Sequence, residues 1–116
     1  MLKLKQWAAD LNAMMQQLYG IRSLQTPMTG FTIAAGATVS LLVLNPAGTL
    51  ATGTVTFPAN PADNQPFELM SSQTVTALTA NTSDSSTSNG APTALTANIA
   101  VKFRFVKSLG KWFREQ

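Results

Sequence analysis

Few side chains in this chain are suited to acid–base or metal chemistry. Cysteine and histidine are both absent from its 116 residues. Without a thiol or an imidazole there is no Ser-His-Asp triad, no cysteine nucleophile and no zinc site built from the usual ligands. The carboxylates are the remaining candidates, and there are five of them: Asp10, Asp63, Glu68, Asp84 and Glu115. The sequence therefore predicts a non-enzymatic protein without catalytic residues.

Asp63 and Glu68 are the two carboxylates that lie close together in sequence. A glycosidase needs two carboxylates held across a cleft, and Asp63 with Asn64 could supply oxygen ligands to calcium. No further residue supports either chemistry. We interpret Asp63 as shaping its loop and Glu68 as part of a solvated strand face, and we expect neither a metal site nor a cofactor.

The C-terminal residues combine basic and aromatic side chains, which are the ingredients of a platform for single-stranded nucleic acid. Over residues 99–106, however, Phe103 and Phe105 alternate with Lys102 and Arg104. In a strand this spacing puts the rings and the charges on opposite faces. We therefore predict an amphipathic final hairpin with Trp112 or Phe113 closing the core, and no nucleic-acid partner.

Charge is scarce and unevenly distributed. Only 11% of the residues are charged, against about 25% in an average soluble domain. Residues 23–101 contain no lysine or arginine. Such a chain must keep its surface soluble with Ser, Thr, Asn and Gln, or must cover much of that surface in an assembly. Both interpretations favour a structural protein.

No segment has the pattern of a membrane anchor or an export signal. The most apolar run, residues 33–44, is interrupted by Gly36, Thr38 and Ser40 and is shorter than the roughly 20 residues that a spanning helix needs. We expect it to form a buried strand pair. Near the N-terminus, Asp10 and Asn12 interrupt the apolar core that a signal peptide requires. We predict no membrane insertion.

Residues 2–19 have the composition of a helix that ends at Gly20. Apolar residues recur at alternating spacings of three and four and form what we call the heptad seam: Leu4, Trp7, Leu11, Met14, Leu18 and Ile21. A narrow two-column stripe of this kind favours self-association. A helix packed on its own sheet is the other interpretation. We assign residues 1–22 as an N-terminal assembly helix.

After a connector over residues 23–28, the composition changes to the Thr, Val, Ala, Gly and Phe typical of strands and turns. Many short strands without intervening helices are typical of a sandwich or barrel. We therefore predict that residues 29–116 form an antiparallel β-sandwich or jelly-roll-like domain in a mainly β protein with a single N-terminal α-helix. The predicted strands cover residues 30–35, 38–44, 50–57, 67–71, 73–79, 93–97, 99–107 and 111–114.

Two polar loops and one repeat stand out within this domain. The loops cover residues 58–66, with three prolines, and 81–90, nearly all Ser, Thr, Asn and Asp. The repeat is Thr-Ala-Leu-Thr-Ala-Asn, at 76–81 and again at 93–98, which predicts two equivalent strand ends. Loops on a rigid β scaffold often carry binding residues. The candidate recognition residues are Asn60, Asp63, Asn64, Asp84 and Asn89.

Five segments in order form a larger pattern: residues 54–69, 73–79, 90–95, 103–105 and 112–114. The pattern resembles a module of tailed-bacteriophage structural proteins found in tail fibres, head fibres and capsid-decoration proteins. In that module a strand leads into a Leu/Phe-Pro-Ala-Asn-Pro-x-Asp-Gly-Gln loop, and a last strand carries Trp-Tyr/Phe-Arg. Here Asn64 occupies the usual glycine position, and asparagine tolerates the same positive-φ turn.

The resemblance implies a virion component, assembled as a homotrimer and attached to other virion proteins of the capsid, collar or tail. The expected location is the virion. The alternative hypothesis is a carbohydrate- or receptor-binding module of a host-recognition fibre, which would bind a host surface glycan through the two polar loops.

Overall fold

The computed structural model describes residues 21–83 and 86–116, and these residues contain strands, turns and bends but no helix. The helix expected over residues 2–19 lies outside the described residues. The described strands are β1 (Ile21–Gln25), β2 (Phe31–Ala34), β3 (Val39–Leu44), β4 (Leu50–Thr56), β5 (Pro66–Ser71), β6 (Val75–Asn81), β7 (Thr87–Asn89), β8 (Val101–Val106) and β9 (Lys111–Arg114).

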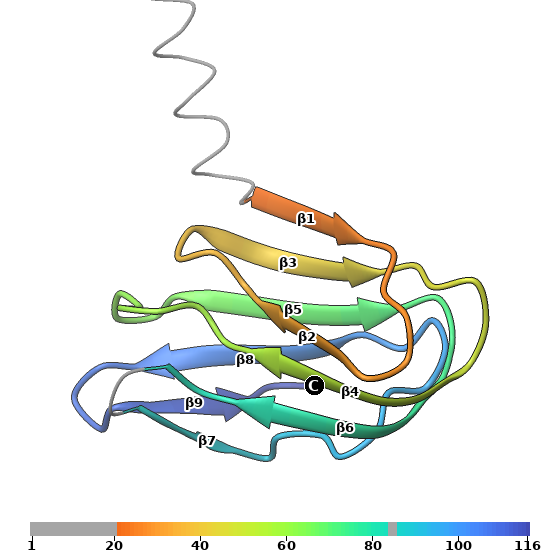
Figure 1. Cartoon of the computed structure of the whole chain (residues 1–116). Helices are drawn as coiled ribbons and strands as arrows, with labels where there is room; N and C mark the ends of the chain where they lie inside the picture. Colours follow the sequence, from red (N-terminus) through yellow and green to blue (C-terminus); the bar gives the residue numbers. More distant parts are fainter. Residues whose placement is uncertain (1–20, 84–85) are drawn as a thin grey trace, which may run out of the picture.

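The first six strands wind as a short β-solenoid of three coils (Figure 1). Successive strands alternate between two sheets, so that β1, β3 and β5 lie side by side in sheet A, while β2, β4 and β6 form sheet B. Within each sheet these strands are parallel. One coil therefore consists of one strand from each sheet: β1 with β2, β3 with β4, and β5 with β6.

The register of the parallel strands stacks apolar side chains from coil to coil. Leu42 of β3 pairs with Leu69 of β5 in sheet A, and both are fully buried. In sheet B, Ile33 pairs with Val55, which pairs in turn with Ala80. Because side chains alternate along a strand, the inward residues of one coil meet those of the next, and the core runs between the two sheets.

The C-terminal strands extend sheet A beyond the third coil. Strand β8 pairs antiparallel with β5, β9 pairs antiparallel with β8, and β7 pairs parallel with β9. This confirms the final hairpin predicted from the alternation at residues 99–106. The buried residues of its inner face are Val101, Phe103 and Phe105, whereas Ile99 lies outside the strand and is exposed.

The predicted antiparallel sandwich is wrong. Consecutive strands of the solenoid do not pair as hairpins, because each short connection crosses from one sheet to the other and the next strand of the same sheet runs in the same direction. An alternating apolar pattern describes one buried face in either orientation. The pattern at 33–44 correctly predicted two strands, but they are not a buried pair, because β2 and β3 lie in different sheets and β2 contains no buried residue.

Most strand positions agree with the prediction, and the exceptions are informative. Residues 21–25, expected at a helix end and in a connector, form β1, and residues 87–89 of an expected loop form β7. Residues 93–97 are not a strand but make one antiparallel bridge, between Leu95 and Val75. The two copies of the repeat therefore lie side by side in opposite directions, rather than as equivalent strand ends.

Aromatic rings fill the core where the third coil meets the C-terminal strands. The Phe57 ring centroid lies 5.0 Å from that of Phe67, 4.8 Å from that of Phe103 and 5.5 Å from that of Trp112. Trp112 is fully buried, which confirms it as a residue that closes the core. Tilted and edge-on ring pairs of this kind add about 0.5–1.5 kcal/mol each to the gain from burial.

Gly53 provides the space for an aromatic side chain of the first coil. Phe31 of β2 pairs with Gly53 of β4, and its ring occupies the place where a Cβ at residue 53 would project. The ring thereby covers the backbone of the second coil and joins the edge of the core. A glycine inside a strand here reflects a close approach between neighbouring coils.

We predict that Gly53→Ala lowers the free energy of unfolding by about 1–3 kcal/mol, the usual cost of overpacking a tight site. Urea unfolding of the full chain measures it. The matched control is Gly48→Ala, because a Cβ at residue 48 meets no atom within 4 Å and its effect should stay within about 0.5 kcal/mol. Equal effects of the two substitutions would contradict the role given to the Phe31 ring.

Candidate assembly surface

The described structure contains one residue of the heptad seam, because Leu4, Trp7, Leu11, Met14 and Leu18 lie outside the described residues. Ile21 is the first residue of β1, so the prediction that it continues a helix is wrong. Its backbone N–H donates a hydrogen bond to Ser40 Oγ at 3.0 Å. The side chain is 38% exposed. The chain before residue 21 therefore leads directly into an edge strand.

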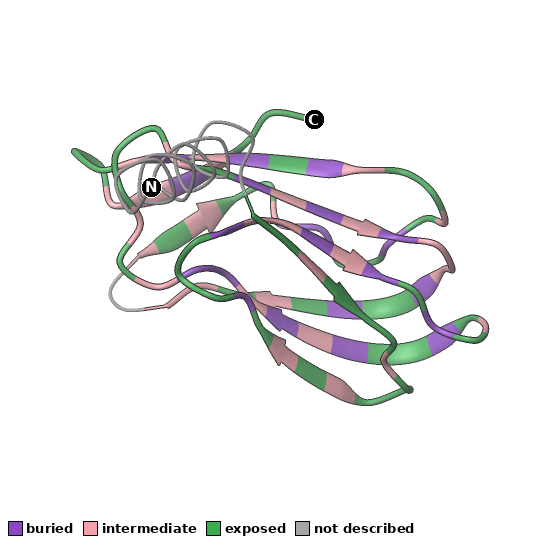
Figure 2. Cartoon of the chain, turned by 90° about the horizontal axis from the view of Figure 1, so that it is seen from above, coloured by how far each residue is buried: buried purple, intermediate pink, exposed green. Residues whose placement is uncertain are grey.

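The first coil leaves one end of the solenoid uncovered by the described residues. We call the surface formed by residues 21–34 the open end. Strand β1 is the outer strand of sheet A and β2 the outer strand of sheet B. Neither strand contains a buried residue, so neither carries a purple segment in Figure 2. An edge strand offers unpaired N–H and C=O groups on its outer side to a further strand.

Apolar side chains accompany the two edges. Leu24 on β1 is 56% exposed and Met28, in the turn to β2, is 80% exposed. Phe31 and Ile33 of β2 pack against the core but remain partly exposed. They do so because the described part of the chain has no coil before the first one. The open end therefore combines backbone hydrogen-bonding groups with apolar surface.

The open end carries little charge that would oppose pairing of its edge strands with another strand. Arg22 is the single charged residue of the open end, and residues 23–62 contain none at all. Natural proteins commonly guard exposed edges with charged residues, prolines or bulges. Strand β1 has Arg22 and a shift of register beside it, whereas β2, with the sequence Phe-Thr-Ile-Ala, has no such feature.

The other end of sheet B is closed by the chain itself. The backbone N–H groups of Val75 and Leu95 each donate to the carbonyl of the other, at 3.0 and 2.9 Å. The N–H of Leu78 donates to the carbonyl of Thr93 at 2.9 Å. The second copy of the repeat thus covers the outer edge of β6 from Val75 to Leu78. The two ends of the solenoid are therefore chemically different.

The loop over residues 58–66 is held by its own hydrogen bonds. Asp63 Oδ1 accepts a hydrogen bond from the backbone N–H of Lys107 at 3.0 Å, which confirms that Asp63 shapes the loop. Gln65 Oε1 accepts from the N–H of Ala62 at 2.9 Å, and Gln65 Nε2 donates to the carbonyl of Ala37 at 3.3 Å. These contacts tie the loop to the start of β3 and to the turn after β8.

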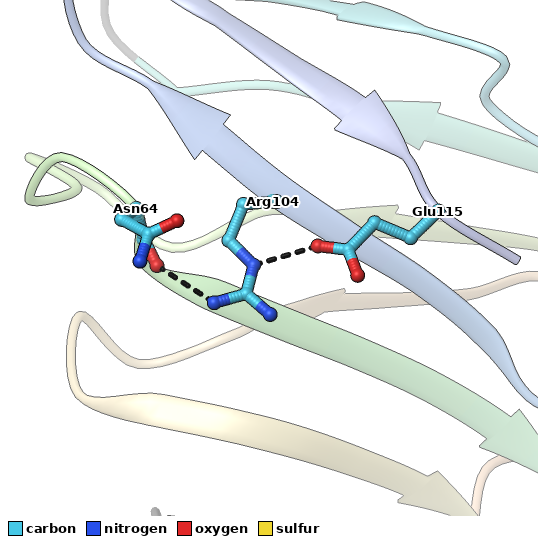
Figure 3. Close-up of polar contacts among 3 residues, drawn as sticks. All are labelled: Asn64, Arg104 and Glu115. Carbon is cyan, nitrogen blue, oxygen red and sulfur yellow. Dashed lines mark hydrogen bonds and ion pairs between the residues drawn. The ribbon is translucent and has the colours of Figure 1, made fainter.

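Asn64 adopts the left-handed backbone conformation with φ of 66°. The sequence comparison led us to expect a positive φ here, because Asn64 stands where glycine is usual. Its N–H donates to the carbonyl of Phe105 at 2.7 Å. Its carbonyl accepts from Arg104 Nη1 at 3.3 Å, and Arg104 Nε pairs with Glu115 at 2.6 Å (Figure 3). This ion pair is exposed and contributes at most about 1 kcal/mol.

The remaining candidate recognition residues are not gathered into one site. Asn60 has a positive φ of 50° in the same loop as Asp63 and Asn64. Asp84 lies outside the described residues. Asn89 is exposed on β7, opposite Phe113 of β9, so its prediction as a loop residue is wrong.

Glu68 lies on the outer face of sheet A, apart from Asp63. Its cross-strand neighbours are Leu41 and Lys102. Glu68, Lys102, Arg104 and Glu115 line a shallow depression of about 270 Å³. Acidic and basic groups mix there, and no group of three or more acidic side chains in residues 21–83 and 86–116 could hold a metal ion. The same residues include no helix long and apolar enough to cross a membrane.

Sequence reasoning missed the main residues of the open end. Leu24 and Met28 were assigned to a connector because Gly20 ends the predicted helix and Pro27 blocks its continuation. The signal that could have identified them is the long charge-free stretch that begins at residue 23, since an uncharged connector is unusual at a solvated surface.

Comparisons with known proteins do not assign this chain to a family. No protein-family model matches the chain and no curated protein matches it. One solved structure, described as "Structure of a chaperone-substrate complex", is similar with a TM-score of 0.46 and 14% sequence identity. The similarity covers 87% of this chain and 16% of that chain.

The left-handed turn at Asn64 gives a direct test of the loop. We predict that Asn64→Gly changes the free energy of unfolding by less than about 0.5 kcal/mol, because glycine adopts this conformation freely. Asn64→Val should cost about 1–2 kcal/mol or more, because a Cβ branch opposes a positive φ. Thermal or urea unfolding measures both.

The control for this pair is Asn89→Val, which places the same side chain at an exposed strand position where β-branched residues are favoured. A cost at Asn64 no greater than the cost at Asn89 would contradict the proposed turn.

Proposed function

We propose that this chain is a non-enzymatic structural protein of a bacteriophage virion, a homotrimeric fibre or decoration component attached to other virion proteins. The observation that carries the proposal is the open end of the solenoid. A domain that stacks coils, closes one edge of sheet B with its own chain and leaves the first coil uncovered is suited to assembly.

Three sequence features support the same proposal. The segment that enters the open end carries the heptad seam, a pattern typical of helices that associate. The β-domain is poor in charge, as expected for a surface covered by neighbours. The order of segments from residue 54 to residue 114 resembles the phage structural module, which implies the virion as the location and three copies as the assembly.

A glycan-binding role at the polar loops has weaker support. Several polar groups of the loop over 58–66 form hydrogen bonds inside the molecule, namely the side chains of Asp63 and Gln65 and the backbone of Asn64. Sugar sites commonly present an exposed aromatic ring, and Trp112 is fully buried here.

Native mass spectrometry of the full chain beside Leu11→Asp tests the assembly. We expect the unmodified chain to be a trimer and Leu11→Asp to be largely monomeric, with the concentration for half-assembly raised more than tenfold. The reason is that the substitution places a charge in the apolar seam.

Asn12→Asp is the matched control, because it adds the same charge at a neighbouring position outside the seam and should leave the trimer intact. A chain that is monomeric without any substitution would overturn the homotrimer.

The virion location has its own test. Purified particles of a phage whose genome carries this sequence should contain the protein, and antibodies raised against the full chain should label the particles in electron microscopy. Detection in the infected-cell lysate but not in the purified particles would contradict the structural role.

A further inference from the structure

The strands of the open end lack the pairing on both sides that strands in the middle of the two sheets have. Every strand between the two edges of sheet A has a partner on each side, and β4 is paired on both sides in sheet B. The outer sides of β1 and β2 have no such partner among the described residues. Beside them lie Leu24 and Met28, which are more than half exposed.

We infer that the open end is the contact surface between copies of this chain, with β1 and β2 of one copy covered by the open ends of the others. The inference rests on the proposed self-assembly and names the part of the β-domain that takes part in it. The occupant is a second copy of the same chain rather than an unrelated partner.

The position of the seam supports this choice of occupant. Ile21 is the last position of the seam in the sequence, and in the structure it is the first residue of β1. If the seams of several copies meet around one axis, each copy begins its β-domain at that axis. Strand β1 is therefore the part of each domain that starts nearest to the neighbouring copies.

The difference between the two ends of the solenoid supports it as well. Residues 93–95 already occupy the outer edge of β6, so the edge strands of one copy cannot continue sheet B of another at that end. Head-to-tail continuation of sheet B is thus blocked at this point, whereas sheet A ends in β7 as its outer strand. Contact among the open ends of copies gathered around one axis gives a closed assembly, and head-to-tail contact would give an open filament. The near absence of charge from residues 21–34 removes a source of repulsion between identical surfaces.

The chain has no cysteine, which makes single-cysteine crosslinking a clean test. Four full-length variants are compared: Leu24→Cys and Thr32→Cys on the two edge strands, Leu11→Cys in the seam, and Ile99→Cys as the control. Leu24 and Ile99 are both 56% exposed, so the thiols are equally accessible. Each purified variant is treated with a short bis-maleimide and run on a denaturing gel.

We expect Leu24→Cys and Thr32→Cys to form covalent dimers at least tenfold faster than Ile99→Cys, with Leu11→Cys also crosslinked. Dilution below the assembly concentration should abolish the difference. Crosslinking at Leu11 but not at Leu24 or Thr32 would overturn the inference and leave the proposed assembly standing.

The other outcomes are equally decisive. A chain that is monomeric, with no crosslink at any of the four positions, would overturn both the inference and the homotrimer. Crosslinking at Ile99 as fast as at Leu24 would also overturn the inference, because the contact would then not be specific to the open end. Crosslinking at Leu24 and Thr32 without Leu11 would support the inference and contradict the seam.

Discussion

Parallel stacking of coils is the constraint on which the rest of this structure depends. The strands of the middle coil, β3 and β4, pair with strands of the coils before and after them, and inward side chains pack on those of the next coil. In a stack of this kind, a middle coil has a neighbour on both sides, whereas a terminal coil leaves one side of its strands unpaired unless another segment covers it. How each end is finished then determines what the molecule can do.

The two ends are finished in different ways. Beyond the third coil, β8 and β9 extend sheet A, the second copy of the repeat covers β6, and the aromatic rings around Phe57 and Trp112 fill the space between the sheets. The loop that carries Asp63 and Asn64 is tied to the same region through Lys107 and Phe105. At the first coil the described residues provide no comparable cover, which is why assembly is the function that the geometry favours.

The sequence predicted strand positions well and strand partners poorly. Alternation identified the inner face of β8, and Trp112 was one of the two residues expected to close the core. The loop chemistry of Asp63 and Asn64 was recognised from residue type. Topology was not predictable because the offset between paired residues varies, from Ser23 with Leu42 to Leu42 with Leu69, so no period marks the coils. Strand β1 was missed because its five residues are nearly all exposed and leave no buried pattern.

The open end is best tested by amide hydrogen exchange of the full chain at two concentrations, one above and one below the assembly threshold. If copies associate through the open end, amides of β1 and β2 are protected at the higher concentration and lose much of that protection on dilution. Amides of β4 and β5, which are paired within the chain on both sides, should change little. Exchange of β1 and β2 that is equally fast at both concentrations would contradict association through the open end.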